Sequence, residues 1–410
     1  MFEAILGLVS CLLAMSVLFF IAHRQNTIQI FSPPFLLLCL VILGCFFRSF
    51  YYFESPPDYY LYGVGALLNA VAFFAIGYLV PRVSFISLNT VRKSFLKRSR
   101  FIHKFTIISA TLLIAVYMQS AGALGARFFV TEDGIRTSYA FLGWGADILL
   151  VAFLLKFAQR GGKGVGVVHW LMFLLALSGA VVLNARLSVL LYIVAALIVR
   201  SLVSEKKFPV KMFVVTSVFV IGGLGLLRES SRGEDTANVS VYQTTYNHVM
   251  TKPYLLAIDK LALIVGKVSE KELYLYGETF ANILVMPIPR VLWEDKPAME
   301  SRLFVTREIY GKEDSMSGTP PGFIGELFIN FSWIGITIGM FLTGAFSRVM
   351  WNSLKKSNNN PLVAVLYTVY LISLFSLFGV DLQGGLIFFL KLFIPIWVFG
   401  RYYIRPTNSG

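Results

Sequence analysis

Residues 318–344 read GTPPGFIGELFINFSWIGITIGMFLTG, and this stretch decides the fold class. Its first five residues hold two prolines and two glycines, which favour a stiff turn. The apolar run that follows extends to residue 346 and contains one charged side chain, Glu326. About 20 apolar residues are enough to cross a bilayer as one helix. The stretch therefore predicts a membrane-spanning helix that begins directly after a rigid turn.

The rest of the chain repeats this apolar pattern. Hydrophobic residues make up 57% of the sequence and charged residues 14%, whereas soluble domains carry about 25% charged residues. We therefore predict an all-α polytopic membrane protein with about eleven spanning helices. No Ala-x-Ala cleavage site follows the first run, so we interpret it as a retained helix. The spans are expected at residues 2–22, 31–50, 59–81, 105–121, 139–158, 165–183, 187–203, 211–228, 323–346, 361–378 and 384–403.

The net charge of +14 is explained better by helix orientation than by nucleic-acid binding, so no nucleic acid is expected as a partner. Lys and Arg gather in the segments that follow every second span. Such segments stay in the cytoplasm, which predicts that the N-terminus lies outside and the C-terminus in the cytoplasm.

One long loop divides the row of spans into three parts. Residues 1–228 are expected to form eight membrane helices, residues 229–322 a large external loop, and residues 323–410 three further helices. The loop is mixed in charge and slightly acidic. Helical apolar spacing predicts short surface helices within it. These helices are expected at residues 238–250, 253–265 and 278–289.

Several motifs of soluble enzymes are absent from the sequence. It contains no GxxxxGK[ST] phosphate loop, no HExxH zinc motif, no GxSxG nucleophile elbow and no Asp-x-Asp pair. We therefore expect no metal and no cofactor, and a zinc enzyme or a nucleotide-driven enzyme is disfavoured.

Polar residues at membrane depth are expensive and are therefore candidate site residues. Glu326 and Asn330 lie one helical turn apart, so they face the same way. They form part of a site, or they make interfacial hydrogen bonds. Arg186 lies in a tight hairpin, VVLNARLSVLL. It either reaches the outer headgroups or stands as a fixed cation beside a bound anion.

Three further charged residues are expected to have structural roles. Asp147 and Lys391 lie deeper in their spans, where pairing is the favoured interpretation. Asp381 comes directly before the last span and is predicted to cap that helix.

The stretch PIPRVLWEDKP (287–297) places two cations between prolines. Arg binds phosphate with a planar fork and Lys binds it as a point charge, so this chemistry suits a phosphate ligand. The alternative is a solvated loop with balanced charges. The candidate cations in and around this loop are Arg228, Arg232, Arg290, Lys296 and Arg302.

Together these stretches resemble the oligosaccharide repeat-unit polymerases, the Wzy-type O-antigen and capsule polymerases. The similarity rests on PIPRVLWEDKP, on the Pro-Gly turn into GELFINF, and on the Asn184–Arg186 hairpin. It implies a GT-C-like helical bundle in the cytoplasmic (inner) membrane of a bacterium. The partners implied are glycan donors and acceptors linked to undecaprenyl diphosphate, membrane lipid and a chain-length regulator protein.

The resemblance also suggests roles for residues. Arg186 and Arg290 would stabilise the diphosphate leaving group, and Glu326 would accept the proton of the acceptor hydroxyl. His248 and Glu278 are weaker candidates for this base, and Trp293 would stack on a sugar. Further substrate contacts are expected from Arg228, Arg232, Lys296, Arg302 and Asn330.

Three other functions stay open. An O-antigen ligase shares the architecture, and its loss would leave long polymer on the carrier. A flippase of lipid-linked sugars would need a polar path through the bundle, for which only two deep charges are available. A non-catalytic membrane scaffold is the last alternative.

Overall fold

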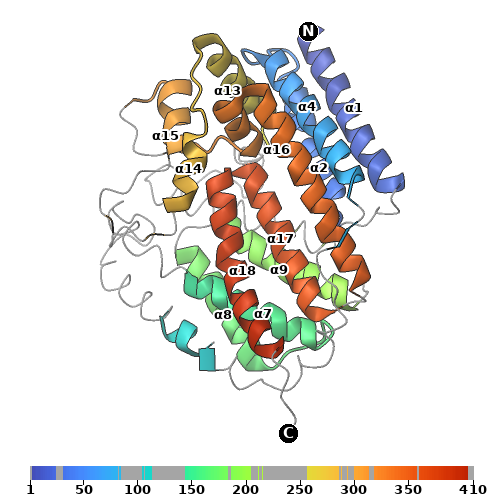
Figure 1. Ribbon diagram of the computed structural model, residues 1–410, viewed down its shortest axis with the longest axis vertical. Coiled ribbons are helices and arrows are strands. Elements are labelled where there is room, and N and C mark those ends of the chain that lie inside the picture. Colours follow the sequence, from blue (N-terminus) through green and yellow to red (C-terminus); the bar gives the residue numbers. More distant parts are fainter. Residues whose placement is uncertain are drawn as a thin grey trace, which may run out of the picture.

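In the computed structural model, every described element is a helix, which confirms the all-α fold class (Figure 1). Five of these helices are long and apolar enough to cross a membrane, so the chain is a membrane protein with several spans. The structure describes residues 2–24, 31–81, 83–84, 104–105, 107–112, 144–182, 186–204, 211, 215, 256–285, 288, 293, 300–313, 318–357 and 360–404.

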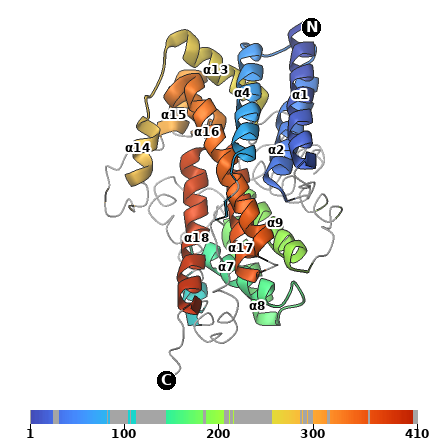
Figure 2. The same ribbon diagram turned by 45° about the vertical axis from the view of Figure 1, so that its right-hand side comes forward.

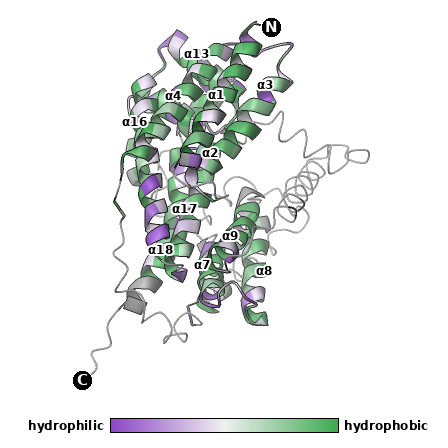
Figure 3. Ribbon diagram, turned by 90° about the vertical axis from the view of Figure 1, so that its right-hand side faces the viewer, coloured by the Kyte–Doolittle hydropathy of each residue, from purple (hydrophilic) through white to green (hydrophobic). Residues whose placement is uncertain are grey.

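The first three spans form one group of adjacent helices. They are α1 (Phe2–Arg24), a second helix from Pro33 to Tyr51, and α4 (Tyr60–Leu79). The second helix consists of α2 (Pro33–Val41), a π-turn (η1, Ile42–Phe46) and α3 (Phe47–Tyr51). Two prolines at its start suit the first helical turn, where their missing N–H groups are not needed. Figure 3 shows apolar residues along α1, α2 and α4, as spans require.

The longest helix is α16 (Phe323–Lys356), and its main partner is α4. Glycines let the two backbones approach closely. A Cβ on Gly344 would lie 2.1 Å from the Phe74 carbonyl oxygen, and one on Gly77 would lie 2.0 Å from that of Phe341. The predicted span 323–346 is therefore helical, but α16 also breaks inside, at Phe331 and Ser332.

A second group of helices lies toward the other end of the long axis. It comprises α7 (Trp144–Gln159), α8 (Val167–Val182) and α9 (Arg186–Ser204). The last two helices, α17 (Pro361–Gly379) and α18 (Leu382–Ile404), pack against each other, and α17 connects this group to α16. Most helical bounds agree with the predicted spans within a few residues, but α16 continues to Lys356, well past the predicted end at residue 346. The predicted spans 105–121 and 211–228 lie mostly outside the described residues.

The described part of the long loop consists of short helices, as predicted. These loop helices are α13 (Ile258–Lys271), α14 (Glu278–Val285), α15 (Glu300–Phe304) and the π-turn η5 (Val305–Ile309). Figures 1 and 2 show α13, α14 and α15 together beside the start of α16, at the end of the molecule where α1 also starts. The helix expected at 238–250 lies outside the described residues.

Candidate active site

The rigid turn predicted at GTPPG positions the start of α16. Residues 318–322 are not helical and α16 begins at Phe323. Gly322 has a φ of 75°, which favours glycine, and its N–H donates to the Val380 carbonyl oxygen over 2.7 Å. A Cβ at this position would lie 3.1 Å from the Phe378 carbonyl oxygen. The turn is therefore fastened to the end of α17, which fixes where the first turn of α16 lies.

Glu326 lies in that first turn and is completely buried. Its Oε2 accepts a hydrogen bond of 2.5 Å from the backbone N–H of Leu382, at the start of α18. Its Oε1 has no hydrogen-bond partner among the described residues; Thr279 lies close to the carboxylate but makes no well-formed bond to Oε1. Buried carboxylate oxygens without a partner are rare, and a catalytic role is one of the few explanations for them.

Asn330 faces the same side as Glu326, as predicted, and ties α16 to α14. Its amide donates to the Glu326 carbonyl oxygen and to the Thr279 hydroxyl, each over 2.8 Å. Its Oδ1 accepts from the Gly277 N–H over 3.1 Å. These bonds use the amide, so Asn330 positions the loop helices, and its predicted contact with substrate has no free polar atom here.

The break in α16 lies directly after Asn330, at Phe331 and Ser332. Ser332 has a φ of 56° and a ψ of −150°, which is a strained conformation for any residue other than glycine. A broken helix leaves carbonyl groups without their usual partners. The Ile329 carbonyl oxygen instead accepts from the Leu275 N–H over 2.9 Å. The segment between α13 and α14 thus completes the first part of α16, Phe323–Asn330, whose residues are all buried.

An ion pair connects α15 to the start of α18. Arg302 donates to both carboxylate oxygens of Asp381, which is completely buried. Asp381 also accepts from the Gly384 N–H, so the predicted helix cap is confirmed. The cap is only part of its role, because the same carboxylate holds a loop residue. The pair uses Nε and Nη2 of the Arg302 guanidinium, and the predicted contact of Arg302 with substrate stays a prediction.

Three further charged residues complete the site, and the sequence analysis missed them. Arg48 is 1% exposed and donates to Asp259 over 2.6 Å, which joins α3 to α13. The neighbouring Lys260 is also buried, and its Nζ donates to the Pro320 carbonyl oxygen over 3.1 Å. We call the six charged residues of this region the junction cluster: Arg48, Asp259, Lys260, Arg302, Glu326 and Asp381.

Lys260 is the electrostatically unusual member of the cluster outside the spans. Burial lowers the pKa of its ammonium group from 10.5 to about 8. Asp259 and Asp381 act in the opposite direction, whereas the positive charge of Arg48 lowers the pKa further. Near neutral pH, Lys260 therefore stands close to the point at which it can exchange a proton.

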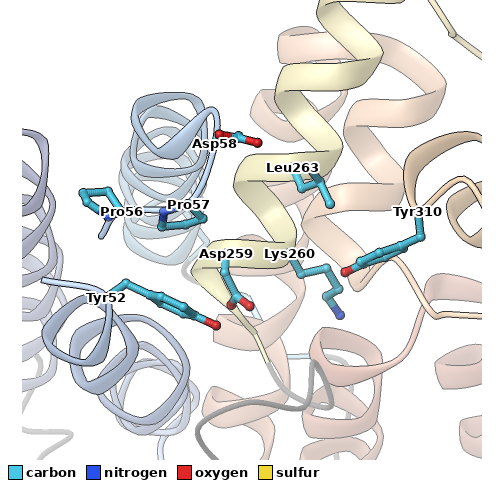
Figure 4. A pocket seen from close by; sticks show the side chains of 8 residues that line it. All are labelled: Tyr52, Pro56, Pro57, Asp58, Asp259, Lys260, Leu263 and Tyr310. Carbon is cyan, nitrogen blue, oxygen red and sulfur yellow. The ribbon is translucent and has the colours of Figure 1, made fainter. Parts of the chain in front are cut away.

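A pocket of about 370 Å³ opens beside Lys260 (Figure 4). Tyr52 and Tyr310 lie on opposite sides of it, and the Asp259 carboxylate lies between them. Pro56, Pro57, Asp58 and Leu263 complete the lining. The pocket thus lies where the turn after α3, the helix α13 and the end of η5 meet.

The other predicted site residues are not part of this region or lie outside the described residues. Arg186 is the first residue of α9, whose main partners are α17, α7 and α8 rather than the loop helices. Trp293 is exposed. The remaining predicted residues lie outside the described part of the chain: Arg228, Arg232, His248, Arg290 and Lys296.

Neither a scan against protein-family models nor searches of curated proteins and of solved structures found a match to this chain. The function is therefore argued from the residues and the geometry. Within the described ranges, no three His, Cys, Asp or Glu side chains converge as metal ligands would. The chemistry available in the junction cluster is proton transfer and the binding of polar or charged groups.

Proposed function

We propose that this protein is a membrane glycosyltransferase that polymerises oligosaccharide repeat units linked to undecaprenyl diphosphate. The growing glycan is transferred from its carrier onto the non-reducing end of a new lipid-linked unit. In this proposal the chain is a GT-C-like bundle of about eleven spans in a bacterial cytoplasmic membrane. Its N-terminus and the loop helices lie outside, and its C-terminus lies in the cytoplasm.

One observation carries the proposal: the buried carboxylate of Glu326 with its unpartnered Oε1. A hydroxyl can act as a nucleophile toward a sugar only if a base within hydrogen-bond reach takes its proton. Oε1 is the one carboxylate oxygen of the junction cluster that is both buried and unpartnered among the described residues. It lies between the loop helices and the start of α18, where a lipid-borne substrate could approach from the bilayer edge.

The proposed reaction moves one proton and exchanges one bond. The acceptor hydroxyl oxygen attacks the anomeric carbon of the donor, and its proton passes to Oε1 of Glu326. The bond from the anomeric carbon to the diphosphate oxygen breaks, and its electron pair leaves with the carrier diphosphate. Cations near the leaving group stabilise the charge that develops there. Arg290 and Lys296 stay our predictions for these cations, with Arg186 contributing from α9.

The hydrogen bonds around the junction support a site that is assembled before substrate arrives. The Arg48–Asp259 and Arg302–Asp381 pairs and the Asn330 amide bind the loop helices to three different spans. Lys267 adds a bond of 2.7 Å from its Nζ to the Ile309 carbonyl oxygen. A catalytic group that several elements hold rigidly needs little reorganisation during the reaction.

The test is the length distribution of surface glycan in a deletion strain that is complemented with variants. Glu326→Gln keeps the size of the side chain and removes its ability to accept a proton. We expect the ladder of glycan lengths to collapse to single repeat units, because losing a general base slows transfer by about 100-fold or more. Glu308→Gln is the matched control, since Glu308 is an exposed carboxylate of the loop helices that belongs neither to the junction cluster nor to the pocket.

A normal ladder from Glu326→Gln at normal protein levels would contradict the proposed base. The deletion strain separates the alternatives. Long polymer that builds up on the carrier would indicate an O-antigen ligase. Single units trapped on the cytoplasmic face would indicate a flippase, and a wild-type ladder would leave the scaffold interpretation.

A further inference from the structure

The pocket beside Lys260 contains a combination of side chains that the proposed chemistry does not use. Its two tyrosines and two prolines offer flat apolar surfaces, whereas Asp58 and Asp259 offer carboxylate oxygens. The volume of about 370 Å³ lies within the range of small-molecule sites, about 300–1,000 Å³. Such a lining suits a ligand with both apolar faces and many hydroxyl groups.

Exposure changes across the pocket in a way that favours insertion of a ring. Asp58 is exposed at the rim, Asp259 is half-buried, and Lys260 is buried at the inner end. Figure 4 shows the hydroxyl ends of Tyr52 and Tyr310 directed toward Asp259 and Lys260. Polar atoms therefore gather at the inner end, while the ring faces of the tyrosines and the prolines form the sides.

The charges of the lining disfavour a phosphate ligand. Two carboxylates and one ammonium group line the pocket, and the Asp259 carboxylate already binds Arg48. A diphosphate that enters the pocket would pass the exposed carboxylate of Asp58 at the rim, which repels it. Neutral hydroxyl groups can instead donate to the carboxylates and accept from Lys260. Aromatic and proline surfaces add contact area for the C–H face of a sugar ring.

We propose that this pocket binds a neutral sugar residue of a glycan, with its ring between Tyr52 and Tyr310 and its hydroxyls on Asp58, Asp259 and Lys260. Lys260 also donates to the carbonyl oxygen of Pro320, in the turn that leads into α16 and Glu326. The pocket therefore lies next to the start of α16 and can position an acceptor. That the glycan belongs to a lipid-linked repeat unit rests on the proposed function; the sugar site itself does not.

The experiment measures binding of a soluble probe to the purified protein in detergent. The probe is the oligosaccharide released by mild acid from the lipid-linked repeat units of the host cell. Saturation-transfer NMR reports which sugar protons contact the protein, and a titration gives the Kd. We expect saturation of ring protons in the wild type and a Kd that rises about 5-fold or more in Asp58→Asn, because a hydrogen-bond acceptor is weakened.

Two further variants keep the test independent of folding. Tyr310→Ala removes one wall and should weaken binding at least as much. Glu54→Gln is the matched control, because Glu54 is an exposed carboxylate in the same turn but does not line the pocket. Only variants whose melting temperature and elution volume match those of the wild type enter the comparison.

The outcomes divide clearly. Loss of binding in Asp58→Asn and Tyr310→Ala, with Glu54→Gln unchanged, supports the sugar site. No saturation transfer in the wild type, or equal binding by every variant, overturns it. Binding of inorganic diphosphate to the wild type, without any saturation transfer to the sugar probe, would also overturn it. The pocket would then hold the carrier group. If sugar binding holds while the deletion strain keeps a wild-type ladder, the proposed function fails and the sugar site stands.

Discussion

Two regions of the molecule bury charged side chains, and they do so in different ways. In the junction cluster, both ion pairs connect a loop residue to a span, and one carboxylate oxygen of Glu326 stays unpartnered. In the second region, Asp147 of α7 accepts a hydrogen bond from the Tyr192 hydroxyl of α9 and is attracted by Lys391 of α18. All three of these residues belong to helices of the bundle.

The difference separates a buried charge that is paired within the helix bundle from one that keeps an unpartnered oxygen. Asp147 is 4% exposed and its partners come from the helices that it packs between. This supports the structural pairing predicted for Asp147 and Lys391. Glu326 has no such complete set of partners, and Pro320, which precedes it in the turn before α16, accepts a hydrogen bond from Lys260 of the pocket. The two regions should therefore respond differently when single partners are removed.

The largest effect on stability is expected in the junction cluster. Arg302→Met removes the partner of Asp381 and leaves its carboxylate buried without an ion pair. Breaking a buried pair in this way costs about 3–5 kcal/mol of the free energy of unfolding. Thermal melting in detergent measures it as a lower Tm. The double variant Arg302→Met with Asp381→Asn should recover part of the loss, since no charge is then left unpaired.

Wild-type melting of the single Arg302→Met variant would show that the pair is loose and that the loop helices are held by other contacts. The Asn330 amide would then be the next candidate, because it bonds Thr279 of α14 and the Glu326 carbonyl oxygen of α16.

A smaller effect is expected in the second region. Tyr192→Phe removes the hydroxyl that donates to Asp147 and changes little else. Loss of one hydrogen bond to a buried carboxylate should lower the free energy of unfolding by about 1–3 kcal/mol. The ladder of glycan lengths should stay normal at matched protein levels. A collapsed ladder with unchanged melting would instead give this region a part in function, and the comparison would fail.

Much of the fold could be predicted from apolar run length alone. Runs such as 2–22 and 59–81 reappear as helices within about two residues, because a bilayer leaves an apolar chain few other conformations. The break at Phe331 and Ser332 could not be predicted. Neither residue is proline or glycine, and the Ile329 carbonyl is satisfied by Leu275, a partner distant in sequence.

The candidate site was only partly accessible from sequence. Glu326, Asn330 and Asp381 were found because charge and amide groups stand out in apolar runs. Arg48 carries the same signal in the run 31–50 and could have been found by the same argument. Its partner could not, because Asp259 lies 211 residues away and one sequence contains no information on such a pairing.

The smallest effect is a dependence of stability on pH. It arises from Lys260, which belongs to the junction cluster and not to the second region. Burial lowers its pKa in the folded protein to about 8, whereas the unfolded chain keeps about 10.5. Between these values the unfolded chain holds a proton that the folded protein has released. Stability due to this group therefore rises with pH over that window, and the full burial penalty is present below pH 8. Lys260→Met lacks this dependence.

The measurement is the difference in Tm between the wild type and Lys260→Met from pH 7 to 9.5. We expect the wild type to gain about 1–3 °C on the variant as the pH rises, because the ammonium group loses its proton while buried. Asp259, Asp381 and Arg48 act on this amine and are present in both proteins, so the difference reports Lys260. A constant difference would mean that Lys260 is hydrated in solution, and the inner end of the pocket would then be open to water.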